Sequence, residues 1–274
     1  MRSLVADPSG PWARTGLARR AAVVLIGGPI VLGAVWSGGM PLALLVTVLA
    51  VAGAEEFRRL ARAAGLPTSP ALGVGALAFP LLAAVGRWDA AWSALLAVAA
   101  LAAVLAVVGE HRPQAVAGAA ADLLGALYLG GLFAHLIVFR DAAGFGAVLA
   151  VVAVVWVNDI VAYFVGVAWG HRPLAPGLSP GKSLEGFAAG LVAATLAGAS
   201  SGALLGWPVG RAAVLGLAVA VASVAGDLWE SAMKRSAGVK DSGAVLPGHG
   251  GILDRFDALL FGAPVGYYLW RWLL

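Results

Sequence analysis

The chain has 274 residues, of which 61% are hydrophobic and only 12% are charged, and its mean hydropathy is +0.92. Soluble domains carry about twice this charged fraction, so the composition is typical of an integral membrane protein. The absence of cysteine excludes disulfides, thiol catalysis and Cys-ligated zinc. The net charge of +4 is typical of membrane topology signals and of contact with anionic headgroups, and we expect no nucleic-acid partner.

The first twenty residues are polar and end in "ARTGLARR", directly before an apolar run. That run, "AAVVLIGGPIVLGAVW", leads into "SGGMP" without a good small-residue cleavage site. We therefore expect residues 1–20 to be a cytoplasmic segment and the apolar run to be the first membrane helix, rather than a cleaved signal peptide.

Nine apolar runs of helix-spanning length follow one another, separated by short polar turns. The pattern predicts an all-α polytopic membrane protein with about nine transmembrane helices. We divide it into an N-terminal multi-span region, 21–140, and a C-terminal catalytic membrane region, 141–274. The predicted spans lie near 21–37, 40–56, 69–86, 90–109, 116–138, 145–169, 184–206, 209–233 and 253–273.

The basic residues predict the orientation, because cytoplasmic loops carry an excess of Lys and Arg. With the N-terminus inside, fourteen of the eighteen Lys and Arg residues fall in cytoplasmic segments. The four on the other side are Arg87, Arg140, Arg211 and Arg271. We therefore expect a multi-pass protein of the inner (plasma) membrane with a cytoplasmic N-terminus and an external C-terminus. The loops 170–183 and 234–252 then both open on the cytoplasm.

Few charges lie in the predicted spans of the first half. Asp122 and His135 are the notable ones, and ionisable groups in lipid cost about 2.5–3.5 kcal/mol or more each. A functional role and a polar pair between helices both remain open for them. Glu55 and Glu56 lie beside Arg58 and Arg59 at a helix end, and we interpret them as an interfacial charge cluster.

The second half holds more polar chemistry. Asn158 and Asp159 lie inside an apolar run, and Asp159 can be a proton relay or a structural hydrogen-bonding group. The next loop, "HRPLAPGLSPGKSLEG", contains prolines that forbid a helix, and Ser183 can cap the helix that follows. Its Ser, Gly and Lys residues before a helix N-terminus are consistent with a phosphate cradle.

The eighth span ends in "VAGDLWESAMKR", in which Asp227 and Glu230 share a helix face. Ser231 and Lys234 continue that face, each one turn after a carboxylate. Two carboxylates at a membrane helix end are costly unless a cation neutralises them. Either Lys234 or a divalent cation such as Mg²⁺, with its preference for hard oxygen ligands, would do so.

The stretch "KRSAGVKDSGAVLPGHGGILDRFD" joins the last two spans and collects charges in an otherwise apolar chain. It holds Lys240 and Asp241, then a glycine-rich turn around His249, then Asp254 and Asp257 on one face of the next helix. Carboxylates at the end of one helix and the start of the next, with basic residues between them, suit a metal–phosphate site. His249 fits a hydrogen-bond partner of phosphate or carboxylate better than a metal ligand.

These residues resemble the phosphatidate cytidylyltransferases, or CDP-diacylglycerol synthases. The family signature is fitted at every fixed position from Ser231 through Lys234, Arg235, Lys240, Asp241, Gly243, Pro247, His249, Gly250, Gly251, Asp254 and Arg255 to Asp257. Upstream, Asn158, Asp159, Ala162, Tyr163, Ser179, Pro180, Lys182, Glu185 and Gly186 are similar to the family as well. At Gly181 the family often has a second lysine, and at Leu184 an aromatic residue.

The resemblance implies transfer of a cytidylyl group from CTP to phosphatidate, giving CDP-diacylglycerol and pyrophosphate, with Mg²⁺. A second cation and a homodimer remain open, and membrane lipids are expected partners. The implied catalytic residues are Asp227, Lys240, Asp241, His249, Asp254 and Arg255, with Asp227, Asp254 and Asp241 as metal ligands. The implied substrate-binding residues are Ser179, Lys182, Glu185, Ser231, Lys234, Arg235, Gly250 and Gly251.

Two alternatives remain. The first is another CTP-dependent lipid enzyme, such as a polyprenol kinase or an ether-lipid cytidylyltransferase. The second is an ion-coupled secondary transporter, which predicts charges near the bilayer midplane in two repeated halves. Here the charges gather at one membrane face and in one half of the chain, which favours an enzyme at the membrane interface.

Overall fold

The structure is a computed structural model that describes residues 25–109, 112–243 and 250–274. The predictions for residues 1–20, Pro247 and His249 lie outside the described residues. Within them the chain is mostly helical, as the apolar runs predict. The helical elements are Leu25–Ser37, α2 (Gly39–Ala63), α3 (Ala71–Ala84), η1 (Trp88–Ala90), α4 (Ala91–Val108), η2 (Arg112–Gln114), α5 (Ala115–Gly125), the π-helical η3 (Ala126–Gly131), α6 (Leu132–Trp169), α7 (Leu184–Leu205), α8 (Val209–Ser236) and α9 (Leu253–Leu273).

In the part of the chain that the structure describes, five helical stretches are long and apolar enough to cross a membrane. They are Gly39–Ala63, Trp88–Val108, Ala115–Trp169, Leu184–Leu205 and Val209–Ser236. Shorter apolar helices occupy Leu25–Ser37 and Ala71–Ala84. The coarse prediction of a helical membrane protein is therefore confirmed.

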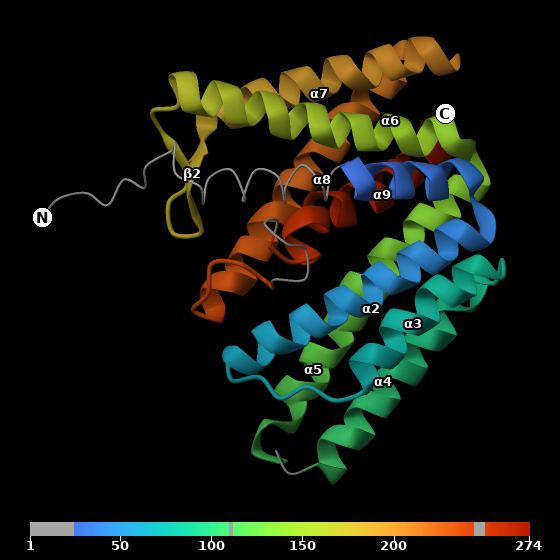
Figure 1. Cartoon of the computed structure of the whole chain (residues 1–274), viewed down its shortest axis with the longest axis vertical. Coiled ribbons are helices and arrows are strands. Elements are labelled where there is room, and N and C mark those ends of the chain that lie inside the picture. Colours follow the sequence, from blue (N-terminus) through green and yellow to red (C-terminus); the bar gives the residue numbers. More distant parts are fainter. Residues whose placement is uncertain (1–24, 110–111, 244–249) are drawn as a thin grey trace, which may run out of the picture.

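The longest stretch, Ala115–Trp169, is interrupted at Gly144. This residue has φ 83° and ψ 177°, which a side chain would disfavour and glycine allows. The interruption lies where the sequence predicts a turn between the spans 116–138 and 145–169. In Figure 1 the chain changes direction within α6, and the second part of α6 then lies beside α7.

The helices form two neighbouring groups that share α6 (Figure 1). Helices α2, α3, α4 and α5 pack on one another, while α7 packs between α6 and α8, and α8 packs on α9. Small residues allow close approach in the second group. A methyl group on Gly198 would lie 2.8 Å from the Cα of Gly216 on the facing helix. Such close backbone packing replaces the hydrophobic effect as the source of helix association in lipid.

A short β-hairpin is the exception to the helical fold. Strands β1 (Pro173–Ala175) and β2 (Ser179–Ser183) pair antiparallel, with Pro173 opposite Ser183. Prolines exclude a helix here, as predicted. Ser183 ends the hairpin and caps α7, because its hydroxyl accepts a hydrogen bond from the Gly186 N–H at 3.1 Å. The hairpin brings Lys182 to the base of α7.

Candidate functional site

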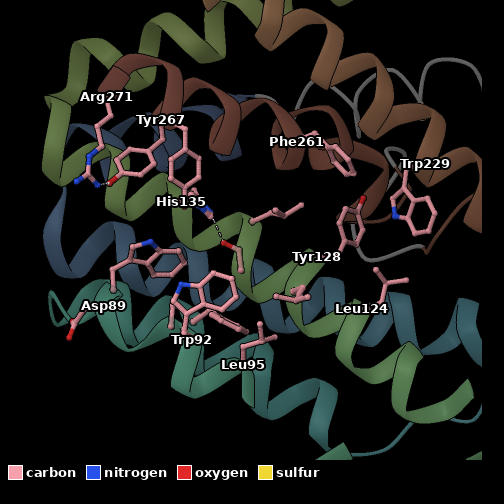
Figure 2. A pocket seen from close by; sticks show the side chains of 17 residues that line it. Asp89, Trp92, Leu95, Leu124, Tyr128, His135, Trp229, Phe261, Tyr267 and Arg271 are labelled. Atoms are coloured by element: carbon pink, nitrogen blue, oxygen red, sulfur yellow. Dashed lines mark hydrogen bonds between the residues drawn. The ribbon is translucent and has the colours of Figure 1, made fainter. Parts of the chain in front are cut away.

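Two cavities among the described residues bear on function. The larger has a volume of about 1150 Å³ and is lined in part by the charged residues Asp159, Lys182, Asp227, Glu230, Lys234, Asp241, Asp254, Arg255 and Asp257. The smaller, about 880 Å³, has mainly aromatic and aliphatic walls, with His135, Tyr267 and Arg271 toward one end and Tyr128, Trp229 and Phe261 toward the other (Figure 2). The larger cavity is the candidate site, because it gathers residues from the hairpin, α8 and α9 that the sequence singles out.

An ion pair joins the hairpin to α8 at this cavity. The ammonium group of Lys182 on β2 contacts the carboxylate of Asp227 on α8. Both side chains are about one-third exposed, so solvent and ligands reach them. A predicted phosphate-binding lysine and a predicted metal ligand therefore lie side by side.

A second lysine joins α8 to α9. Lys234 Nζ lies 2.5 Å from Glu230 Oε2 and 2.8 Å from Asp254 Oδ1. Glu230 is almost completely buried, and Lys234 is the cation that pairs with its carboxyl group there. The sequence predicts that Lys234 or a divalent cation neutralises Asp227 and Glu230. In the structure Lys234 neutralises Glu230, while Lys182 neutralises Asp227.

Asp254 is held in place by further hydrogen bonds. Its Oδ2 accepts from the backbone N–H of Ser242 at 3.0 Å, the Ser242 hydroxyl at 2.9 Å and the Gly251 N–H at 2.8 Å. Gly250 has φ 82°, and a methyl group on it would lie 2.7 Å from Asp254 Oδ2. The group that closely approaches this glycine turn in the structure is the Asp254 carboxylate.

Other predicted residues contact the protein backbone. Glu185 accepts hydrogen bonds from the N–H groups of His171 and Arg172 at 3.1 and 3.2 Å, which holds the start of the loop 170–183. Arg235 donates to the carbonyls of Leu178 and Val239 at 3.3 and 3.1 Å. It thereby links the loop 170–183 to the loop after α8. These contacts give both side chains a part in shaping the site, and their predicted contacts with substrate stay predictions.

The remaining predicted residues differ in their positions. Asp241 and Arg255 are exposed and line the larger cavity. Ser231 is buried, Ser179 pairs with Ala175 in the hairpin, and Lys240 is exposed. Gly251 is buried against Ser242 and Glu56. Six of the predicted residues line this one cavity, namely Lys182, Asp227, Lys234, Asp241, Asp254 and Arg255.

Asp122 and His135, the ionisable residues of the first half, lie outside this site. Asp122 accepts hydrogen bonds from the backbone N–H of Ser69 at 2.9 and 3.0 Å and from the Ser69 hydroxyl, which fixes the chain before α3. His135 Nδ1 lies 2.8 Å from the Gly131 carbonyl, and its ring packs on Trp88 and Tyr268. Both side chains therefore make contacts between structural elements.

The sequence interpretation of Glu56 as part of an interfacial charge cluster is wrong. Glu55 fits that description, because it is exposed and pairs with Arg58 and Arg59. Glu56 is only 1% exposed and accepts hydrogen bonds from the N–H groups of Ile252 and Leu253 at 2.9 and 3.0 Å. Glu56 and Glu230 are the two buried acids near the site that the predicted residue set leaves out. The sequence offers one signal for both residues, which is an acidic residue on a helix face that is otherwise apolar.

The positions of the acidic side chains show which of them could bind a metal ion. No group of three or more His, Asp or Glu residues with metal-site geometry occurs in the part of the chain that the structure describes. Mg²⁺ does not require one, because it takes one or two carboxylates and completes its shell with phosphate and water. Asp227 offers a partly exposed carboxylate in the cavity, and Asp257 and Asp159 line the same cavity. Both oxygens of Asp254 already accept hydrogen bonds, Oδ1 from Lys234 and Oδ2 from Ser242 and Gly251.

Comparison with known proteins identifies the family. Residues 18–273 match the family model described as "Cytidylyltransferase family". The chain is 43% identical over 150 residues to a phosphatidate cytidylyltransferase of Bacillus subtilis (strain 168), covering 53% of this chain and 56% of the relative. It is 40% identical over 174 residues to a phosphatidate cytidylyltransferase of Helicobacter pylori (strain ATCC 700392 / 26695), covering 62% of this chain and 61% of the relative.

The matched segments thus span about half the length of the curated relatives, whereas the family model spans nearly the whole chain. The cavity between the hairpin, α8 and α9 lies within the matched residues 18–273. The chain belongs to the cytidylyltransferase family.

Proposed function

We propose that this chain transfers a cytidylyl group from CTP to phosphatidate, giving CDP-diacylglycerol and pyrophosphate for phospholipid synthesis. One observation carries the proposal. Five signature residues, Lys234, Asp241, Asp254, Arg255 and Asp257, line a single cavity of about 1150 Å³ together with Lys182 of the hairpin. The family match and the names of the relatives support the choice of CTP and phosphatidate.

The reaction needs charge neutralisation more than acid–base catalysis. A phosphate oxygen of phosphatidate, ionised at neutral pH, attacks the α-phosphorus of CTP. A new P–O bond forms there as the bond to the β-phosphate oxygen breaks, and pyrophosphate leaves with that electron pair. The obstacle is the approach of two polyanions, so the protein must position them in line and neutralise them.

Different residues around the cavity bind the phosphate groups and hold the helices in position. Lys182 and Arg255 line the cavity and can bind phosphate oxygens by charge-assisted hydrogen bonds. Lys234 is largely buried between Glu230 and Asp254, so it orients these acids and fixes α8 against α9. We assign Lys240, Asp241 and His249 to the cytoplasmic loop between the last two spans, which carries the family signature.

Magnesium is the proposed cofactor, with Asp227 as its first protein ligand and Asp254 and Asp241 as further candidates. When bound, Mg²⁺ would neutralise the triphosphate and stabilise charge on the leaving group. Asp227 supports this role because it lies on the cavity wall beside Lys182.

Nothing in the site favours the alternatives over this function. A transporter would place its coupling charges in two repeated halves, whereas these charges come from α6, the hairpin, α8, the loop after α8 and α9, all in the second half of the chain. A CTP-dependent lipid kinase would release CDP instead of pyrophosphate, which provides a direct test.

We also propose nine membrane spans, with a cytoplasmic N-terminus, an external C-terminus and an active site that faces the cytoplasm. Contacts between the predicted external segments support this. Arg140 donates to the Val35 and Trp36 carbonyls at 2.7 Å, and Arg211 donates to the Leu273 carbonyl at 2.9 Å. Bacterial relatives support the plasma membrane as the location.

The decisive experiment is an assay of the purified protein in mixed micelles with labelled CTP and Mg²⁺. We expect CDP-diacylglycerol and pyrophosphate in equal amounts when phosphatidate is the acceptor. Diacylglycerol and a polyprenol serve as control acceptors, because a kinase would phosphorylate them and release CDP. CTP consumption with these acceptors and not with phosphatidate would refute the proposal.

A further inference from the structure

Glu56 is a buried acid far from the signature in the sequence. It lies near the end of α2, and its side chain is 1% exposed, whereas that of Glu55 beside it is 43% exposed. A buried carboxylate without partners would cost several kcal/mol. Its partners therefore reveal what the residue does.

Both oxygens of Glu56 bind the start of α9. Oε1 accepts from the Ile252 N–H at 2.9 Å, and Oε2 accepts from the Leu253 N–H at 3.0 Å and from the Ser242 hydroxyl at 3.2 Å. The first backbone N–H groups of a helix have no partner within the helix, and Ile252 at the N-cap of α9 has no side chain that could accept from them. Glu56 supplies the missing acceptor from another helix.

Two glycines of the loop between α8 and α9 lie directly against the same carboxylate. A methyl group on Gly243 would lie 2.7 Å from Glu56 Oε1, and one on Gly251 would collide with Glu56 Oε2 and the Ser242 hydroxyl. These positions require glycine because the Glu56 carboxylate fills the space. The loop between α8 and α9 therefore packs on Glu56 at both of its described ends.

Ser242 connects Glu56 to the active site. Its hydroxyl lies 3.2 Å from Glu56 Oε2 and 2.9 Å from Asp254 Oδ2. Asp254 and Arg255, both in the predicted catalytic set, belong to the first turn of α9, which Glu56 caps. A shift at Glu56 would therefore move these two residues together.

We propose that Glu56 is a positioning residue that fixes the first turn of α9 together with Ser242 and Gly251, and thereby places Asp254 and Arg255 for phosphoryl chemistry. The proposal rests on the proposed cytidylyl transfer for its kinetic test. Glu56 itself contacts no substrate. It acts from α2, outside the signature, through hydrogen bonds to backbone groups.

The main test is Glu56→Gln, which keeps the shape of the side chain. Its amide presents one oxygen and one NH₂ group, so a donor now faces a backbone donor. We expect kcat to fall about ten- to a hundredfold, the effect typical of losing a charge-assisted hydrogen bond. KM for CTP should change less than kcat, because Lys182, the other phosphate-binding residue, lies on the hairpin and is untouched. Glu55→Gln is the matched control, with unchanged kcat.

Amide hydrogen exchange provides a readout that does not depend on activity. In Glu56→Gln we expect faster exchange in a peptide covering 250–256, and in Glu55→Gln we expect no change. Near-normal kcat in folded Glu56→Gln, or a lower kcat with unchanged exchange at 250–256, would overturn the proposal. If wild-type protein makes no CDP-diacylglycerol, the proposed function fails, while the exchange data still decide whether Glu56 caps α9.

Ser242→Ala keeps the proposal testable if Glu56→Gln does not accumulate. This variant removes only the hydroxyl that lies between Glu56 and Asp254 and leaves the two backbone contacts of Glu56 in place. We expect kcat to fall several-fold with little change in either KM. An unchanged kcat in Ser242→Ala would show that the link does not position Asp254.

Discussion

Lys182 and Lys234 neutralise acids on the same helix, α8, but in surroundings that differ. Lys234 is largely enclosed between Glu230 and Asp254, whereas Lys182 and Asp227 remain partly exposed in the cavity. A buried pair contributes chiefly to fixing the helices, and an exposed pair can exchange partners with an incoming ligand. The Lys182–Asp227 pair is therefore the one suited to bind substrate and cation.

Asp227→Asn tests the acid of this pair. We expect kcat to fall at least about a hundredfold, because the substitution removes the charge that would hold Mg²⁺ and leaves Lys182 without its partner. Folding should persist, since Asn has the same shape and the site is partly exposed. Steady-state turnover at saturating Mg²⁺ measures the effect, with Asp89→Asn, in the exposed Arg87–Asp89 pair, as the control. Near-normal turnover would show that Asp227 is not an essential ligand.

Lys182→Ala tests the lysine of this ion pair. We expect KM for CTP to rise about ten- to a hundredfold, with a smaller change for phosphatidate, because one charge-assisted phosphate contact is lost. Gly181 leaves Lys182 as the only lysine in its loop, so no second lysine there can replace it. Kinetics with each substrate varied separately measure the effect, with Arg87→Ala as the control. If Lys182 only anchors the helix end in anionic headgroups, the protein yield will fall and KM for CTP will stay constant.

At the scale of single residues, the sequence predicts interactions between residues that are close together in the chain. Glu230 and Lys234 are one helical turn apart, and their ion pair follows from that spacing. Glu56 shows the opposite case, because its partner Ile252 is 196 residues away. Its neighbours Glu55, Arg58 and Arg59 form a partly exposed cluster of ion pairs, so the local composition concealed a buried acid.

At the scale of elements, prolines and glycines gave the clearest predictions. The proline-rich loop was expected to be non-helical and Ser183 was expected to cap the next helix, and the structure contains a hairpin that ends in that cap. The hairpin itself, however, was not predicted. Its strands are only three and five residues long, which is too short for an alternating pattern to emerge.

The turn before α9 can be tested with Gly250→Ala. Alanine at φ 82° costs about 1–2 kcal/mol, and its methyl group would lie 2.7 Å from Asp254 Oδ2. We therefore expect both a lower melting temperature and a fall in kcat of at least about tenfold. Gly177→Ala is the matched control, since that glycine has free space around its Cα and lies in the hairpin turn. Wild-type kcat in Gly250→Ala would show that Asp254 does not depend on the shape of this turn.

At the scale of the whole molecule, long-range contacts fall into two sets that match the predicted sides of the membrane. Arg140 and Arg211 connect segments predicted to be external. Glu56, Ser242 and Arg235 connect segments predicted to be cytoplasmic. The topology prediction rests on the number of Lys and Arg residues in each segment. The division of the contacts into two sets rests instead on which segments touch each other. The two lines of reasoning support the same topology.

Cysteine labelling tests that topology, and the chain contains no cysteine that would interfere. Val239→Cys should react with a membrane-impermeant maleimide only when the cytoplasmic face is open, because Val239 lies in the exposed part of the loop after α8. Asp89→Cys, and a cysteine added after Leu274, should react from outside in intact cells. Ser242 is unsuitable for this test, since it is buried and hydrogen-bonded to Asp254. Labelling of Val239→Cys and the C-terminal cysteine from the same side would contradict an odd number of spans, because the last helix would then fail to cross the membrane.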